Sequence, residues 1–266
     1  MAQIKTTYDS GGSGRFALDA LADPKDTFRF FDDFFTATGP HILEGTETGS
    51  VQQMDLYKIV QLESNSTLPA IDSSNACGIL RITTGGTADM GHIIHPEAKI
   101  NRPDQKSATY EVRVAVNDVS ASNFFFGFAE DPAESDTIQN GAVVAAANGK
   151  DRIGWFNDTN TTTGAAQVFC SFGSAGLAGT TNGELDTMFG NGSSNTAASD
   201  GDFVRFGVEI VGGSKVNFYY NGDLKHTVSD VSKLSDAKLY PIMLMTTNAD
   251  TAETFDVDYI DVSGER

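Results

Sequence analysis

Hydrophobic and polar residues alternate with a period of two along much of the chain from residue 28 onward. This alternation puts apolar side chains on one face of an extended strand and polar side chains on the other. In ATYEVRVAV at 108–116, every second residue from Tyr110 to Val116 is apolar. In NFFFGFAED at 123–131, the alternate phenylalanines form one face that must be buried. Both segments are therefore predicted to be strands of a core sheet.

Short runs of β-branched and aromatic residues, bounded by Gly, Asn, Asp and Pro, predict further strands. These lie at 28–35, 54–63, 78–84, 141–148, 152–158, 166–172, 239–247 and 253–262. The region 173–201 is rich in Gly, Ser, Thr and Asn, and it is expected to form long loops with a short strand or turn near 185–189. A loop region of this length is often functional.

The stretch at 202–228 predicts a three-stranded meander. Apolar residues alternate over 204–210 and again over 216–220. The Asn-Gly pair at 221–222 supplies the two positive φ angles that a tight type I′ hairpin turn requires. A third strand is expected at 224–228.

About fourteen short strands and no convincing long helix predict an all-β fold, an antiparallel β-sandwich. Residues 28–266 are expected to form this single domain, because sandwiches often reach about 250 residues as one unit. Residues 1–27, with GGSG at 11–14 and a weak helical patch, are expected to form an extended N-terminal arm. Such arms are commonly frayed ends, and the functional alternative is an arm that reaches a neighbouring subunit.

Charge and composition narrow the classes of function. The chain has 266 residues and a formal net charge of −18, which disfavours nucleic acid as a partner. No apolar run approaches the roughly 18 residues that a membrane helix needs, and no secretory signal is recognisable at the N-terminus. We expect synthesis in a cytosol, no membrane partner and no cofactor. Cys77 and Cys170 lie in apolar stretches, which favours two buried thiols over a disulfide.

The patterns at 203–210, 216–222 and 255–262 resemble the C-terminal half of concanavalin A-like and laminin-G-like jelly rolls. FFFGFAED at 124–131 resembles an upstream strand of the same fold, and FRFFDDFF at 28–35 resembles a segment that precedes many such domains. The resemblance implies a concanavalin-like jelly roll over nearly the whole predicted domain. It is more specific for fold than for function.

The general appearance of the chain resembles virion structural proteins of tailed bacteriophages, especially capsid decoration proteins. The shared features are a short polar arm, an acidic surface and one large jelly roll. This resemblance implies a non-enzymatic virion protein that decorates or cements the capsid surface. Its expected partners are the major capsid protein and copies of itself, and its expected location is the virion.

An enzymatic alternative begins at Glu184 and Asp186, which match the first two acids of the Glu-x-Asp-x-x-Glu signature of laminarinase-like glucanases. These retaining enzymes need two carboxylates about 5–5.5 Å apart. The third acid of the signature is replaced by Phe189, or by Met188 in a shorter variant, and neither can donate a proton. We therefore expect no catalytic residues.

Metal sites are also disfavoured. His92 and His95 lie three apart, so on a strand they face opposite sides, and we expect one surface and one half-buried histidine. Asp256, Asp258 and Asp261 on the last strand could bind calcium only if the backbone looped around it, and we expect them to be solvated. The other weak calcium candidate is a set of loop acids, namely Glu130, Asp131, Glu134 and Asp136.

A carbohydrate-binding, lectin-like module on a fibre or free in solution remains the main alternative function, with a glycoside hydrolase behind it. Tyr219 points away from its neighbours Phe218 and Tyr220, so it is the first aromatic to test for sugar binding. Trp155, the single tryptophan, is the second candidate.

Overall fold

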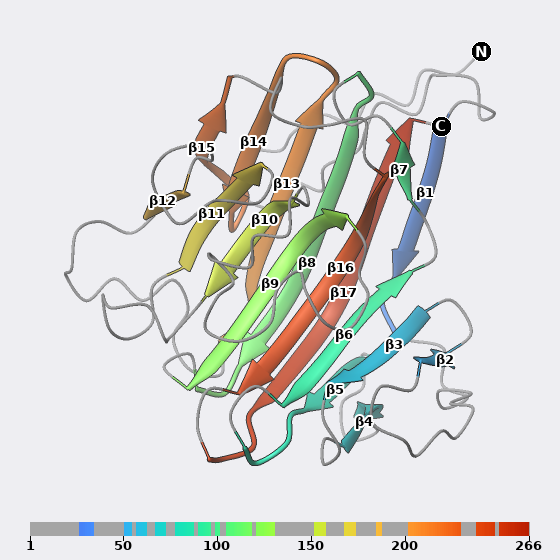
Figure 1. Ribbon diagram of the computed structural model, residues 1–266, viewed down its shortest axis with the longest axis vertical. Coiled ribbons are helices and arrows are strands. Elements are labelled where there is room, and N and C mark those ends of the chain that lie inside the picture. The colour runs from blue at the N-terminus through green and yellow to red at the C-terminus, as the bar shows by residue number, and fades with distance from the viewer. Residues whose placement is uncertain are drawn as a thin grey trace.

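The computed structural model describes residues 27–34, 51–54, 57–62, 67–72, 78–87, 90–96, 99–101, 105–118, 121–130, 152–157, 168–173, 185–187, 202–229, 238–247 and 250–265. In these parts of the chain every regular element is a strand, and the strands form two antiparallel sheets packed face to face (Figure 1). The predicted all-β antiparallel sandwich is thus confirmed. No helix able to cross a membrane occurs among the described residues.

The eight-stranded sheet has the order β15-β14-β13-β8-β17-β5-β4, and β1 pairs with β17 beyond the end of β5. Its strands are β1 (Thr27–Asp32), β4 (Thr67–Asp72), β5 (Ile79–Thr83), β8 (Ala108–Val116), β13 (Val204–Val211), β14 (Lys215–Tyr220), β15 (Asp223–Val228) and β17 (Thr254–Glu265). The long β17 therefore has β8 along one side, and β5 and then β1 along the other.

The nine-stranded sheet has the order β12-β11-β10-β9-β16-β6-β3-β2, and β7 pairs with β16. Its strands are β2 (Val51–Met54), β3 (Tyr57–Leu62), β6 (Gly91–Pro96), β7 (Ile100–Asn101), β9 (Ser122–Glu130), β10 (Arg152–Asn157), β11 (Val168–Gly173), β12 (Leu185–Thr187) and β16 (Lys238–Thr247).

The main core lies between the two sheets and follows the predicted alternation. The apolar residues of β8 and the alternate phenylalanines of β9 all belong to it. Trp155 is fully buried there, with its ring centroid 5.7 Å from that of Phe206 and 6.0 Å from that of Phe218. Its indole nitrogen donates a hydrogen bond of 2.9 Å to the backbone oxygen of Gly207 in the opposite sheet. The buried indole therefore finds a partner for its one polar atom.

The predicted meander is confirmed, with one correction. Asn221 and Gly222 have φ angles of 51° and 88°, as the hairpin turn requires. The pairing of β14 with β15 shifts register between Phe218 and Tyr219, where the ladder is irregular. The two-residue turn places Leu224 opposite Tyr219, on the face that points away from the core, and the shift then brings His226 and Val228 opposite Phe218 and Val216 on the core face. Extending the alternation of apolar and polar residues through the third strand does not predict that Leu224 is exposed.

Some strands carry weak sequence signals. β2, β4 and β7 were not predicted as strands, since they are short and alternate poorly. The sequence of β6 was considered only for its two histidines, and the strand is buried on both faces. The strand predicted at 141–148, Cys77, and residues 1–26 of the expected arm lie outside the described residues, as does the side chain of Cys170 on β11.

His92 is a polar residue inside the main core. It lies on β6 opposite Gln61 of β3 and Met245 of β16, and its side chain has no exposed surface. Neither ring nitrogen has a hydrogen-bond partner among the residues that the structure describes. Burial lowers the pKa of His92 from 6.5 to about 4, because a charged imidazolium would lose its hydration. The expectation of one surface histidine is therefore wrong, since His95 is buried as well.

We predict that His92 makes the protein less stable in mild acid. Between pH 6.5 and 4 the unfolded chain protonates this residue while the folded chain does not, so stability falls as the pH falls. The expected loss is about 2 kcal/mol between pH 7.5 and pH 5, a range above the isoelectric point near 4.4. His92→Leu should remove this part of the pH dependence and raise stability at pH 7.5.

Urea unfolding at several pH values measures both effects. Thr246→Val, at a buried position on β16 that carries no ionisable group, is the control and should keep the pH dependence of the wild type. An unchanged pH profile in His92→Leu would contradict the prediction.

Candidate functional site

The outer face of the eight-stranded sheet carries the densest polar network among the described residues. We call it the arginine face. It consists of Arg29, Phe31, Arg81, Thr109, Glu111, Arg113, Arg205, Glu209, Asn217, Tyr219, Leu224, Asp256, Asp258, Tyr259, Asp261 and Ser263. These side chains stand in register across neighbouring strands, so each acid lies within reach of a basic or polar group.

Two aspartates of β17 each accept a two-pronged pair of hydrogen bonds from an arginine. Asp261 accepts bonds of 3.1 and 2.7 Å from Arg29 on β1, and Asp256 accepts two bonds of 2.7 Å from Arg81 on β5. The Asp261 side chain is 5% exposed and that of Asp256 is 21% exposed. The hydrogen bonds to Asp261 raise the pKa of Arg29 above its usual value, against the opposing effect of burial. Such pairs are the stronger kind of charge-assisted bond.

The third aspartate lies at an irregularity. The pairing of β17 with β8 shifts register between Val257 and Tyr259, and Asp258 sits in this bulge. Asp258 forms an ion pair with Arg113 of β8, and the Arg113 guanidinium also lies 4.7 Å from the centre of the Phe203 ring. Arg113 is thereby held between an anion and an aromatic face.

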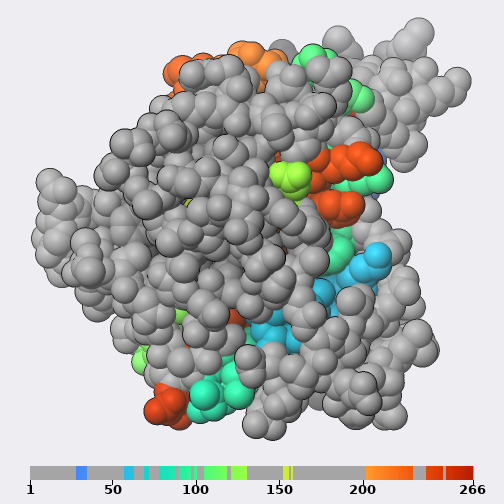
Figure 2. Space-filling model, viewed as in Figure 1, coloured from blue at the N-terminus to red at the C-terminus, as the bar shows by residue number. Residues whose placement is uncertain are grey.

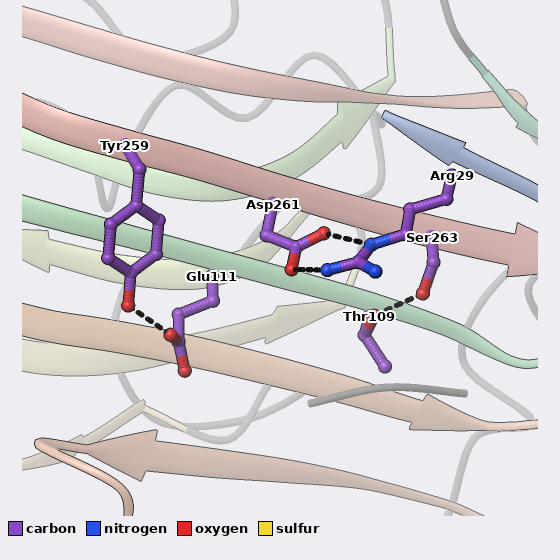
Figure 3. A network of polar contacts seen from close by, with 6 residues as sticks. All are labelled: Arg29, Thr109, Glu111, Tyr259, Asp261 and Ser263. Carbon is purple, nitrogen blue, oxygen red and sulfur yellow. Dashed lines mark hydrogen bonds and ion pairs between the residues drawn. The ribbon is translucent and has the colours of Figure 1, made fainter. Parts of the chain in front are cut away.

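A second part of the network is seen from close by in Figure 3. The Tyr259 hydroxyl donates to Glu111, and the Thr109 and Ser263 hydroxyls share a hydrogen bond of 2.6 Å. Burial and the Glu111 carboxylate together raise the pKa of Tyr259, while Arg205 opposes the rise. Tyr259 therefore stays protonated and serves as a donor at neutral pH.

These pairs correct the expectation that the aspartates of the last strand are solvated. All three face arginines of neighbouring strands, which sequence spacing along one strand could not reveal. Their oxygens are already used as acceptors, which weakens any calcium site at this strand. Among the described residues, no group of three or more potential ligands is placed to hold a metal ion. Of the loop acids, only Glu130 at the end of β9 lies within the described residues.

Tyr219 lies on the arginine face, opposite to Phe218 and Tyr220 as predicted. Its hydroxyl donates a bond of 2.9 Å to Glu209, which also accepts a bond of 2.7 Å from Asn217. The residue is half-buried, so part of it is exposed to solvent. It remains a candidate for stacking against a sugar.

Trp155 occupies a different environment. It lies on the inner face of the nine-stranded sheet and has no exposed surface. A side chain in this position holds the two sheets together and offers no surface for a sugar to stack on. The two sequence-predicted candidates therefore do not share one site.

The centre of the outer face of the nine-stranded sheet carries an apolar row. Val60, Ile93, Leu244 and Phe125 form one continuous row across β3, β6, β16 and β9. All belong to a second hydrophobic cluster and are at most 4% exposed. Figure 2 views the molecule from this side, where parts of β3 in light blue and β16 in orange-red reach the surface. Over these four strands the sheet presents no row of carboxylates.

The apolar row extends toward β10, where Gly154 and the ring of Phe125 approach each other closely. A Cβ atom on Gly154 would lie only 2.5 Å from the ring of Phe125, so glycine makes room for that ring. Gly127, opposite Gly154 in the ladder, has a φ of 155°. A Cβ atom on Gly127 would lie 2.2 Å from the Ile153 oxygen, so Gly154 makes room for Phe125 and Gly127 for the β10 backbone, packing roles that the sequence alone does not disclose.

The remaining candidates do not converge on a site. His92 and His95 point to opposite faces of β6, as predicted; the His95 ring contacts Tyr240 at a centroid distance of 5.9 Å. Asp186 lies on β12 with its backbone opposite Cys170, and Glu184 is outside the described residues. The structure thus gives no pair of glucanase carboxylates to evaluate.

The two sheets and their strand pairing define a concanavalin A-like jelly roll. Peanut lectin superposes with a TM-score of 0.54 at 11% identity, over 90% of this chain and 97% of the lectin. The LamAcat protein of Zobellia galactanivorans gives 0.52 at 12% identity, over 88% and 96%. A pseudo β-1,3-glucanase of Mycobacterium tuberculosis gives 0.51 at 14% identity, over 89% and 98%. At these identities the likeness shows the fold alone.

No protein-family model matches the chain, and the search of curated proteins finds no match either. The fold is therefore established by structure, and function has to be argued from the chain's own residues.

We predict that the buried pair on the arginine face stabilises the fold more than the exposed pair. Asp261→Ala should lower the free energy of unfolding by about 2 kcal/mol, since it removes an acceptor that is almost fully buried. Asp256→Ala, which removes the same two-pronged geometry at a more exposed position, should cost less than about 1 kcal/mol.

Urea unfolding of the two variants measures the difference. The effect of Asp256→Ala should also shrink in high salt, because exposed charges are screened. Equal losses in the two variants would contradict the ranking.

Proposed function

We propose that this protein is non-enzymatic and acts through surface contacts. The observation that carries the proposal is the state of its carboxylates: the five acids of the arginine face are each bonded to an arginine, a tyrosine or an amide. A glycosidase needs one carboxylic acid able to give a proton and a second carboxylate poised about 5–5.5 Å away. Acids already bonded in this way serve as structural anchors.

Within this class we propose a virion structural protein of a tailed bacteriophage that decorates or cements the capsid surface. A net charge of −18 suits an outer shell protein, since it would be repelled by packaged DNA. A rigid sandwich with a polar segment ahead of its first strand suits a protein that binds to the lattice of capsid subunits. The expected partners are the major capsid protein and further copies of this chain.

Co-sedimentation with undecorated capsids tests this role. We expect the full chain to pellet with the capsids and a chain lacking residues 1–26 to bind more weakly, because β1 begins only at Thr27. The matched control is Ala252→Asp, an exposed change between β16 and β17. No co-sedimentation of the full chain would refute the capsid role.

A carbohydrate-binding function is the second candidate, and the ring of the half-buried Tyr219, beside Glu209 and Asn217, favours it. If this ring stacks on a sugar, Tyr219→Ala should abolish binding on a glycan array, while Tyr219→Phe should retain most of it. Trp155→Ala is no test of binding, because removal of a buried indole would damage the core. Binding unchanged by Tyr219→Ala would exclude this residue.

The same proposal predicts no hydrolysis of β-glucans. Purified protein should release no reducing ends above background, and Glu184→Gln should behave as the wild type does. Release that is lost in Glu184→Gln would overturn the non-enzymatic proposal.

A further inference from the structure

The arginine face is unusual in its charge. Four arginines and five acids lie on it, so it is within one charge of neutral, whereas the chain as a whole carries −18. Two copies of such a chain repel each other in most orientations. The face on which charges cancel is the one through which two copies can approach with least repulsion.

The outermost groups of this face have the composition of a protein–protein interface. The side chains of Arg29, Arg81 and Arg113 are 51%, 44% and 39% exposed, whereas their aspartate partners lie beneath them. Tyr259 lies on β17, between the strands of these arginines, and Tyr219 lies on β14, on the far side of β8; both tyrosines are half-buried. Arginine and aromatic residues are enriched where proteins bind one another, and they supply most binding hot spots.

Both large hydrophobic side chains that are exposed in the described part of the chain lie on this face. Phe31 is 36% exposed and Leu224 is 54% exposed. They stand at opposite ends of one register row, which runs from Leu224 through Tyr219, Gly207, Glu111 and Asp261 to Phe31. At about 4.8 Å per strand, these two ends are about 24 Å apart.

We propose that the arginine face is a self-association surface, on which a second copy of this chain packs face to face about a two-fold axis parallel to the strands. That axis passes through the middle of the row, between β13 and β8, and it places Phe31 of each copy over Leu224 of the other. It also sets the Arg29 side of one copy over the β14–β15 side of the other, so the Arg29 guanidiniums stay apart. At the axis Arg113 of each copy, paired with Asp258, lies over Arg205 of the other. Sheets that pack face to face keep their strands roughly aligned in this way.

The size of the face sets the strength of the contact. Six strands by about six residues give about 500 Å² of flat sheet per copy, or about 1,000 Å² in total. That is the lower limit for a specific interface, so the dimer should be weak and should depend on concentration. The inference does not rest on the proposed capsid role, because it concerns the free protein.

Sedimentation velocity over a micromolar concentration series tests the contact in the absence of capsids. Wild type should shift from monomer to dimer with increasing concentration. Phe31→Asp and Leu224→Arg should each weaken dimerisation at least about tenfold. Ala252→Asp adds the same charge as Phe31→Asp away from this face and should leave dimerisation unchanged.

Mixing the two variants tests the proposed axis. A mixed dimer keeps one native Phe31–Leu224 contact and gains an Asp–Arg pair at the other, so the mixture should dimerise better than either variant alone. Circular dichroism confirms that each variant is folded.

Three results would overturn the inference. They are a wild type that stays monomeric throughout, variants that dimerise as the control does, and a mixture that gains nothing. Co-sedimentation with capsids is a separate readout, so failure of the capsid role would leave this result intact.

Discussion

A carboxylate in the middle of a sheet has to find a donor, and β17 carries three of them on its outer face. Each meets an arginine from a different neighbouring strand: Asp256 from β5, Asp258 from β8 and Asp261 from β1. A shift of any of these strands by one residue would turn its arginine to the other face. The ion pairs therefore fix the register of the strands around β17 and, with it, the geometry of the outer surface.

The two outer faces of the sandwich carry side chains of different chemical character. The eight-stranded sheet presents paired charges and aromatic rings, whereas the nine-stranded sheet presents an apolar row that is itself buried. Glu111 and Asp261 are cross-strand neighbours on the eight-stranded sheet, and each already accepts a hydrogen bond, Glu111 from Tyr259 and Asp261 from Arg29. The same fold is found in a lectin and in a glucanase, so activity on this scaffold depends on the side chains attached to it.

Local pattern predicts the parts of this structure that local forces determine. The strand at 108–116 was predicted with its observed bounds, because alternation and burial agree there. The hairpin turn at 221–222 was also predicted correctly from the sequence. β6 was not predicted as a strand, because a strand buried on both faces need not alternate between apolar and polar residues. The bulge that puts Leu224 and Val228 on opposite faces also left no signal in composition.

The candidate site depends on contacts between residues far apart in the chain. Arg29 and Asp261 are separated by 232 positions, and the local sequence around neither residue indicates that they pair. A single tryptophan is as consistent with a core as with a sugar platform, and only the structure places Trp155 inside. Spacing along the sequence identifies neighbours on one strand. To predict charge pairs across a sheet, the order of the strands must be known.

The way β1 joins the sheet has a mechanical consequence. Thr27 lies opposite Glu265, so the start of β1 and the end of β17 meet at the same end of one antiparallel ladder (Figure 1). Tension between these two points would load the outermost hydrogen bonds first and open the ladder like a zipper, pair after pair. A tether attached at both ends would thus peel β1 away under low force, while the central strands, loaded along their length, would resist.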